Sequence, residues 1–340
     1  MQDLIKRINK QLDNLSFETL FSGFTRLEIA IYSENLLYFK DRIIPFSVQN
    51  NVAILQEVDI NMPISVLAAD AVREMFIIFL SKNYKKHFPN DFNVLDYPDN
   101  YLNLDYMSYE KKLLMKSYKT MDLNVKLNYL RMFMNVRGIR KTIIGEAIKE
   151  EYRLETIRGL TLYVYYKALK KLNHKQSEKF LKESFYAMEF FSKEYFDIRH
   201  LSYFVGTTIL LILEDLKIRI SQYDLKNRTI FETMLGKINY IDEMINYIPT
   251  EGLYIKFKRY REEVKNVFID FFAYKTKKVS GEFIITQYDP EGMMKIDNQI
   301  YHSSFVALED LNGKKIFING PVITRVDDNN KCICYFQKVD

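Results

Sequence analysis

The N-terminal part of the chain changes from a helical to a strand-like pattern. Residues 2–22 predict an amphipathic helix because five apolar side chains fall on one face: Leu4, Ile5, Ile8, Leu12 and Leu15. Short apolar runs separated by polar turns follow from Phe24 to Leu55. They predict an antiparallel β-meander of three or four strands over about residues 24–56.

A helical period returns at Ile64 and holds to about Lys275. The predicted helices cover residues 65–86, 108–120, 123–136, 138–172, 175–192, 195–221, 228–247 and 251–275. No period of 20–50 residues recurs, so a repeat protein is not indicated.

The last part of the chain is strand-like again. Its predicted strands cover residues 282–288, 293–296, 299–308, 314–318, 321–326 and 332–339. The pattern as a whole predicts an α+β protein with a mainly helical body, an N-terminal antiparallel β-meander and a small C-terminal β module. We expect two domains, the body over residues 1–277 and a small barrel or sheet over residues 278–340.

Composition narrows the class of protein. Hydrophobic residues make up 48% of the chain and charged residues 27%, which is typical of a globular protein. The first residues carry charges throughout, and the longest nearly apolar stretch, Phe204 to Leu213, is about half of what a membrane span needs. Cys332 and Cys334 lie two residues apart, as reduced strand cysteines would. We therefore expect a cytoplasmic protein with no membrane partner.

One predicted helix combines a buried pattern with a charged stripe. Residues 65–80 are apolar nearly all round, yet Asp70, Arg73 and Glu74 fall on one side, and Ile77 continues that side. Buried charges are costly unless they are paired. A charged partner is therefore expected to face this stripe.

The best partner in the sequence is the stretch from Glu150 to Lys171 within the predicted helix over residues 138–172. Glu151, Glu155 and Arg158 fall on one of its faces, and Gly159 permits the close approach of another backbone. We expect this helix to cross the helix over residues 65–80, with Arg73 near Glu155 and Arg158 near Glu74 or Asp70. The alternative is an Asp70–Arg73 pair within one helix, with the other charges on the surface.

These segments resemble the HExxH zinc metallopeptidases of the gluzincin type. The run Arg73-Glu74-Met75-Phe76-Ile77 resembles their active-site helix, and Glu155 with Gly159 resembles the helix that supplies their glutamate ligand. The stretch from Arg199 to Gly206 resembles a helix that borders their cleft, with His200 and Tyr203 as cleft candidates. The resemblance implies a zincin-like domain.

The metal ligands that the resemblance requires are missing. Arg73 and Ile77 occupy the two histidine positions; arginine stays protonated, and isoleucine has no donor atom. We therefore predict no bound metal, no cofactor and no catalytic residue. The hypothesis that follows is that Arg73 and Arg158 supply the positive charge that zinc would supply beside Glu74 and Glu155.

The favoured function is a non-catalytic module that binds a peptide or protein. An extended peptide would pair with an edge strand, such as residues 36–39 or 52–55. Two alternatives stay open. One is an enzyme of unrelated chemistry that uses Glu74, Glu155 or His200. The other is a nucleic-acid-associated helical protein, for which the candidate contacts are basic residues: Lys256, Lys258, Arg259, Arg261, Lys265, Lys275, Lys277 and Lys278.

Overall fold

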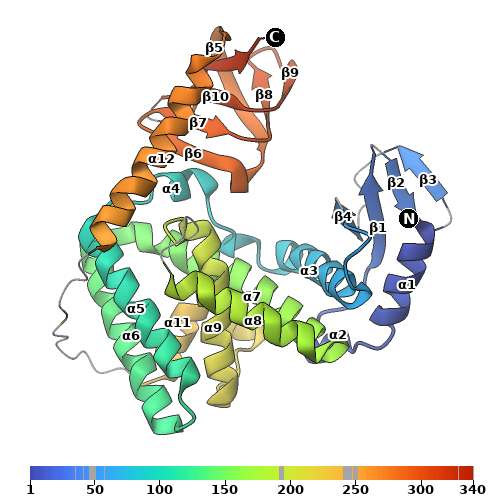
Figure 1. Cartoon of the computed structure of the whole chain (residues 1–340), viewed down its shortest axis with the longest axis vertical. Helices are drawn as coiled ribbons and strands as arrows, with labels where there is room; N and C mark the ends of the chain where they lie inside the picture. Colours follow the sequence, from blue (N-terminus) through green and yellow to red (C-terminus); the bar gives the residue numbers. More distant parts are fainter. Residues whose placement is uncertain are drawn as a thin grey trace. The chain divides into compact units, whose positions relative to one another are not determined.

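The computed structural model (Figure 1) describes residues 1–34, 36–40, 42–45, 51–56, 58–190, 195–239, 247, 252–327 and 329–339. It is an α+β protein that is 59% helical, with a mixed four-stranded sheet near the N-terminus and a seven-stranded antiparallel sheet near the C-terminus. This confirms the predicted fold class.

The chain forms two compact units. The first contains Met1–Phe88 and Leu102–Ile248, and the second contains Pro89–Tyr101 and Pro249–Asp340. The division differs from the boundary expected at residue 277, because a long helix before that residue packs on the C-terminal sheet.

The first unit begins with two helices where one was predicted. They are α1 (Gln2–Leu12) and α2 (Phe17–Leu20). The Asn14 side chain donates a hydrogen bond to the Lys10 carbonyl at 3.2 Å. Since that carbonyl lies in the last turn of α1, the bond satisfies a group that helix termination leaves without a partner.

The N-terminal sheet contains β1 (Glu28–Ser33), β2 (Leu36–Phe39), β3 (Arg42–Pro45) and β4 (Val52–Gln56), in the order β3-β2-β1-β4. The first three strands form the predicted antiparallel meander, whereas β4 pairs with β1 in parallel. The expectation that residues 36–39 form an edge is wrong, because β2 lies between β1 and β3. The polar turns predicted between these strands include residues 35, 41, 49 and 50, which lie outside the described residues.

The remaining helices of this unit contribute many of its buried apolar side chains, and Figure 1 shows how their backbones are arranged. They are α3 (Ile64–Asn83), α5 (Tyr101–Lys119), α6 (Leu123–Ile144), α7 (Ile148–Leu172), α8 (His174–Glu189), α9 (Ile198–Asp215), α10 (Gln222–Asn227) and α11 (Ile230–Lys237). The first residue of α5, Tyr101, is assigned to the second unit. The break expected near residue 137 is absent, and α6 continues to Ile144, where it is capped by Gly145, whose φ of 58° few other residues adopt. The predicted ends of the helices at residues 192 and 247 extend into 191–194 and 240–246, which lie outside the described residues.

The second unit packs two helices on its sheet. The helices are α4 (Asp91–Leu95) and α12 (Leu253–Ala273). The strands are β5 (Thr276–Tyr288), β6 (Met293–Ile296), β7 (Gln299–His302), β8 (Phe305–Asp310), β9 (Lys315–Asn319), β10 (Val322–Val326) and β11 (Cys332–Lys338), in the order β6-β7-β10-β11-β5-β8-β9. The single strand predicted over residues 299–308 is two strands, β7 and β8, which pair with different neighbours.

Both helices of the second unit bury apolar side chains on the sheet. Phe268 and Phe271 of α12 cluster with Ile323 of β10, and Phe92 of α4 packs on a cluster that includes Met293. Cys332 and Cys334 are free, buried thiols in β11, as expected for strand cysteines. None of the helices in the described ranges is long and apolar enough to cross a lipid bilayer.

Candidate functional site

The three charged side chains on the stripe of α3 pair with one another: Arg73 lies between Asp70 and Glu74. The Arg73 guanidinium lies 3.2 Å from an Asp70 carboxylate oxygen and 3.1 Å from a Glu74 carboxylate oxygen. The side chain of Arg73 is 39% exposed, so this triad borders solvent. Burial raises the pKa of Asp70 and Arg73 opposes that rise. Burial also lowers the pKa of Arg73, but Asp70 and Glu74 outweigh it and hold this pKa above its ordinary value.

The predicted pair between Arg73 and Glu155 does not form. Glu155 is 1% exposed and accepts a hydrogen bond at 2.8 Å from Arg137 of α6. Arg158 of α7 stacks on a ring of α9, with its Cζ 4.9 Å from the centroid of Tyr203. The structure therefore supports the alternative of an Asp70–Arg73 pair within one helix, but Glu151 and Glu155 are buried and not on the surface.

Glu151 and Glu155 belong to a buried ion cluster between α5, α6 and α7. Arg137 binds both oxygens of Glu110 at 2.9 and 2.6 Å, and Arg140 binds both oxygens of Glu151 at 2.8 and 2.6 Å. Arg140 also pairs with Glu110. Five ionisable side chains are thus enclosed together, three carboxylates with two guanidinium groups.

Burial shifts the pKa values of ionisable groups in and beside this cluster. Burial raises the pKa of Glu155 to about 7, although Arg137 opposes that rise. Lys111 of α5 is fully enclosed beside the cluster, and burial lowers its pKa well below the ordinary value. Its Nζ lies 3.0 Å from the centroid of the Tyr195 ring. The cluster is enclosed by protein, so it acts as part of the core and not as a surface for substrate.

Sequence reasoning did not find Glu110, Arg137 or Arg140. Arg137 and Arg140 are three residues apart in one helix and share a face, which was the available signal. Their carboxylate partners come from two other helices, so the pairing depends on tertiary packing.

These side chains do not fit the zinc site that the metallopeptidase resemblance implies. Arg73 and Ile77 offer no ligand atom, and the Glu155 carboxylate is bound to Arg137. Across the described part of the chain, no group of three His, Cys, Asp or Glu side chains is placed to hold a metal ion.

The cleft candidates lie on α9. The His200 imidazole Nδ1 is 3.4 Å from an Asp197 carboxylate oxygen, and Asp197 caps α9 by accepting the Arg199 backbone N–H at 2.8 Å. Tyr203 of α9 lies beneath the Arg158 guanidinium of α7. Arg158 and Tyr203 are therefore brought together by α7 and α9.

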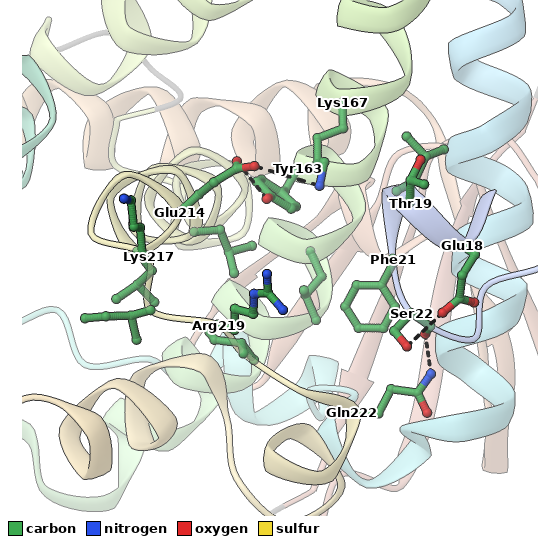
Figure 2. Close-up of a pocket in the computed structure, with 16 residues that line it drawn as sticks. Glu18, Thr19, Phe21, Ser22, Tyr163, Lys167, Glu214, Lys217, Arg219 and Gln222 are labelled. Atoms are coloured by element: carbon green, nitrogen blue, oxygen red, sulfur yellow. Dashed lines mark hydrogen bonds and ion pairs between the residues drawn. The ribbon is translucent and has the colours of Figure 1, made fainter. Parts of the chain in front are cut away.

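A separate cavity of about 800 Å³ lies in the first unit (Figure 2). Its walls come from α2, from α7 and α9, and from the connection between α9 and α10. Leu160, Leu210 and Leu213 line it, together with the charged residues Lys167 and Arg219. The volume falls within the roughly 300–1,000 Å³ of small-molecule sites.

No protein-family model matches the chain, and searches of curated proteins and of solved structures likewise found no match. The zincin resemblance therefore depends on its short motifs alone.

Proposed function

We propose that this chain is a non-catalytic, cytoplasmic protein that binds an extended peptide along strand β4, in a fold derived from a zincin-like metallopeptidase. The observation that carries the proposal is the place of β4, which is an outer strand of the N-terminal sheet and lies beside α3.

Three contacts define the direction of β4 relative to β1 and α3. Its first residue, Val52, pairs with Glu28 and its last residue, Gln56, pairs with Tyr32, both in β1. Among the described strands, none pairs with its other side. Lys82, near the end of α3, donates a hydrogen bond to Asn51 just before β4, while the chain leaving β4 reaches the start of α3 within a few residues. The strand therefore runs antiparallel to the helix that carries Asp70, Arg73 and Glu74.

The sheet beside β4 suits apolar side chains. Tyr32, Phe39 and Ile54 are only partly buried, and they pack against the buried cluster of Ala30, Leu37 and Val52. A peptide that adds to β4 would place every second side chain on one face of the sheet, because side chains alternate along a strand. We expect a preferred peptide to carry apolar residues at alternate positions.

The residues of α3 support binding without hydrolysis. In an HExxH enzyme the glutamate activates a water bound to zinc. Here Glu74 is paired with Arg73, and the ligand positions hold arginine and isoleucine. The buried free thiols Cys332 and Cys334 agree with the reducing compartment included in the proposal.

The test uses synthetic peptides on the full-length protein. Peptides would be selected from a random library displayed on phage, and the tightest would be made in two N-methylated forms, one methylated at odd and one at even positions. A strand pairs with a sheet edge through the backbone N–H groups of alternate residues. We expect one form to bind as the parent does and the other to lose binding, measured by calorimetry. Hydrogen exchange should slow at residues 52–56.

Three outcomes would overturn the proposal. They are equal binding of the two methylated forms, protection that leaves residues 52–56 unchanged, and failure to select any peptide. Cleavage of the bound peptide would contradict its non-catalytic part. Arg219→Gln, which lies in the cavity of Figure 2 and not on β4, is the control variant and should leave peptide binding unchanged.

A further inference from the structure

The cavity of Figure 2 has an apolar wall and a charged side. Leu160 of α7 and Leu210 and Leu213 of α9 form part of the wall, and Ile218 and Ile220 continue it from the connection that follows α9. An apolar wall of this extent favours a ligand with an apolar body, because its burial removes apolar surface from water.

The carboxylates that line the cavity are already engaged. Glu18 accepts hydrogen bonds from the Gly23 backbone N–H at 2.6 Å and from the Ser22 hydroxyl at 3.0 Å. Glu214 accepts a hydrogen bond from the Tyr163 hydroxyl at 2.9 Å. Neither carboxylate is therefore left without a donor.

The cations that line the cavity differ from the carboxylates, because not all of them have a partner of opposite charge. Lys167 lies 3.9 Å from Glu214, whereas Lys217 and Arg219 have no carboxylate partner within the ranges that the structure describes. Figure 2 shows the Arg219 guanidinium extending into the space between the Glu214–Tyr163 pair and Phe21. A planar guanidinium in this position can bind a carboxylate or phosphate through two parallel hydrogen bonds.

The backbone that carries Arg219 is held in place. Lys237 of α11 donates a hydrogen bond to the Arg219 carbonyl at 2.7 Å and pairs with Asp224 at 2.8 Å. On the other side of the cavity, the Gln222 amide donates to the Ser22 carbonyl. These bonds fix the connection between α9 and α10, so less ordering is required when a ligand binds.

A second cavity, of about 770 Å³, shares Thr19, Lys167 and Glu214 with the first. It adds Lys170 and Lys171 to its lining. The two hollows therefore adjoin at Lys167, and the additional lysines make the region attractive to anions from a distance.

We propose that the cavity beside α7 and α9 binds an amphipathic organic anion, with its carboxylate or phosphate head on Arg219 and its apolar body on the leucines of α7 and α9. Lys167 and Lys217 are the other two cations that line the cavity. The site is separate from the peptide surface proposed on β4.

The test measures binding of four eight-carbon probes to the full-length protein by calorimetry: octanoate, octyl phosphate, octanol and octylamine. We expect the two anions to bind saturably and more tightly than the neutral and cationic probes. The ratio of octanoate to octyl phosphate affinity identifies the head group that the site prefers. Inorganic phosphate, which lacks the apolar body, should bind more weakly than octyl phosphate.

Variants assign the head group to its residue. Arg219→Gln should weaken binding of the anions by at least about tenfold, as expected for loss of a charge-assisted hydrogen bond. Arg219→Lys should weaken it less. Arg228→Gln removes an exposed arginine outside the cavity and should have no effect. The proposal is overturned if neither anion binds saturably, if octanol binds as tightly as octanoate, or if Arg219→Gln and Arg228→Gln behave alike.

Discussion

Gly159 of α7 lies against Gly206 of α9 so closely that a Cβ atom built on Gly159 would be 2.5 Å from the Gly206 Cα. A Cβ on Gly206 would be 2.2 Å from the Glu155 carbonyl oxygen. The hydroxyl of Thr207 donates a hydrogen bond across the contact to the Gly159 carbonyl at 3.1 Å. The two helices therefore meet backbone to backbone, one turn from the side chain of Glu155.

Substitution at this contact should separate the helices. We expect Gly159→Ala to lower the free energy of unfolding by about 1–3 kcal/mol, because the added methyl group meets backbone that cannot move aside. Urea denaturation followed by circular dichroism measures the change.

The control is Gly236→Ala in α11, where a Cβ would meet only the mobile end of the Arg228 side chain at 2.8 Å. It should leave stability unchanged or raise it slightly, because alanine favours a helix over glycine. An equal loss in both variants would contradict the proposed close packing.

The buried ion cluster should be sensitive to loss of one cation. Arg137→Met leaves Glu155 without its guanidinium partner in the core and leaves Glu110 with Arg140 alone, and we expect a loss of about 3–5 kcal/mol in the free energy of unfolding. Adding Glu155→Gln should recover part of the loss. Arg73→Met, at a partly exposed pair, should cost no more than about 1 kcal/mol. Similar losses for Arg137→Met and Arg73→Met would argue against an enclosed cluster.

Stability should fall in mild acid because of His302. This residue of β7 is 1% exposed, its Nε2 lies 3.0 Å from the Thr324 hydroxyl, and burial lowers its pKa to about 4. As the pH falls from 6.5 towards 4, His302 is therefore protonated in the unfolded chain but stays neutral in the folded chain. Above about pH 6.5 this histidine does not lower stability, because it is neutral in both states. At pH 4 its protonation in the unfolded chain lowers the free energy of unfolding by on the order of 3 kcal/mol.

Urea titrations at pH 7 and pH 4.5 check this expectation. His302→Gln should narrow the difference in unfolding free energy between the two pH values, while His174→Gln, at an exposed position of α8, should keep it. An unchanged pH dependence in His302→Gln would contradict the assignment.

The zincin interpretation predicts that two histidines restore metal binding. In the double variant Arg73→His, Ile77→His, two imidazoles lie one helical turn apart and can share a zinc ion. We expect it to bind one Zn²⁺ that a chelator removes readily, because Glu155 remains bound to Arg137 and cannot serve as the third ligand.

Mass spectrometry of the dialysed protein measures the metal content. The control is Arg73→His, Ile78→His, whose side chains point to different sides of α3. Equal zinc uptake by the two variants, or none by either, would contradict the interpretation.

Periodicity predicted most elements of the fold because each depends on local sequence. The same pattern did not separate α6 from α7 correctly, since the helix continues past residue 137 until Gly145. It predicted that Gly159 allows close approach of a backbone but assigned the contact to the wrong helix. Glu151 and Glu155 are predicted to face the charged stripe of α3, whereas their actual partners, Arg137 and Arg140, could be identified only from the packing of α6 on α7. The cavity is likewise formed by segments distant in the sequence, so no local motif marks it.

The second unit is discontinuous, and this sets an order on its assembly. Residues 89–101 are synthesised long before the sheet on which Phe92 packs. Domains generally fold as the chain emerges from the ribosome, starting from the N-terminus. The apolar side chain of this early segment therefore stays exposed while the following helices form. It is buried only after the last strands have left the ribosome. No single cut in the chain separates the two units, and a gene fragment that encodes only the C-terminal strands would yield a sheet without α4.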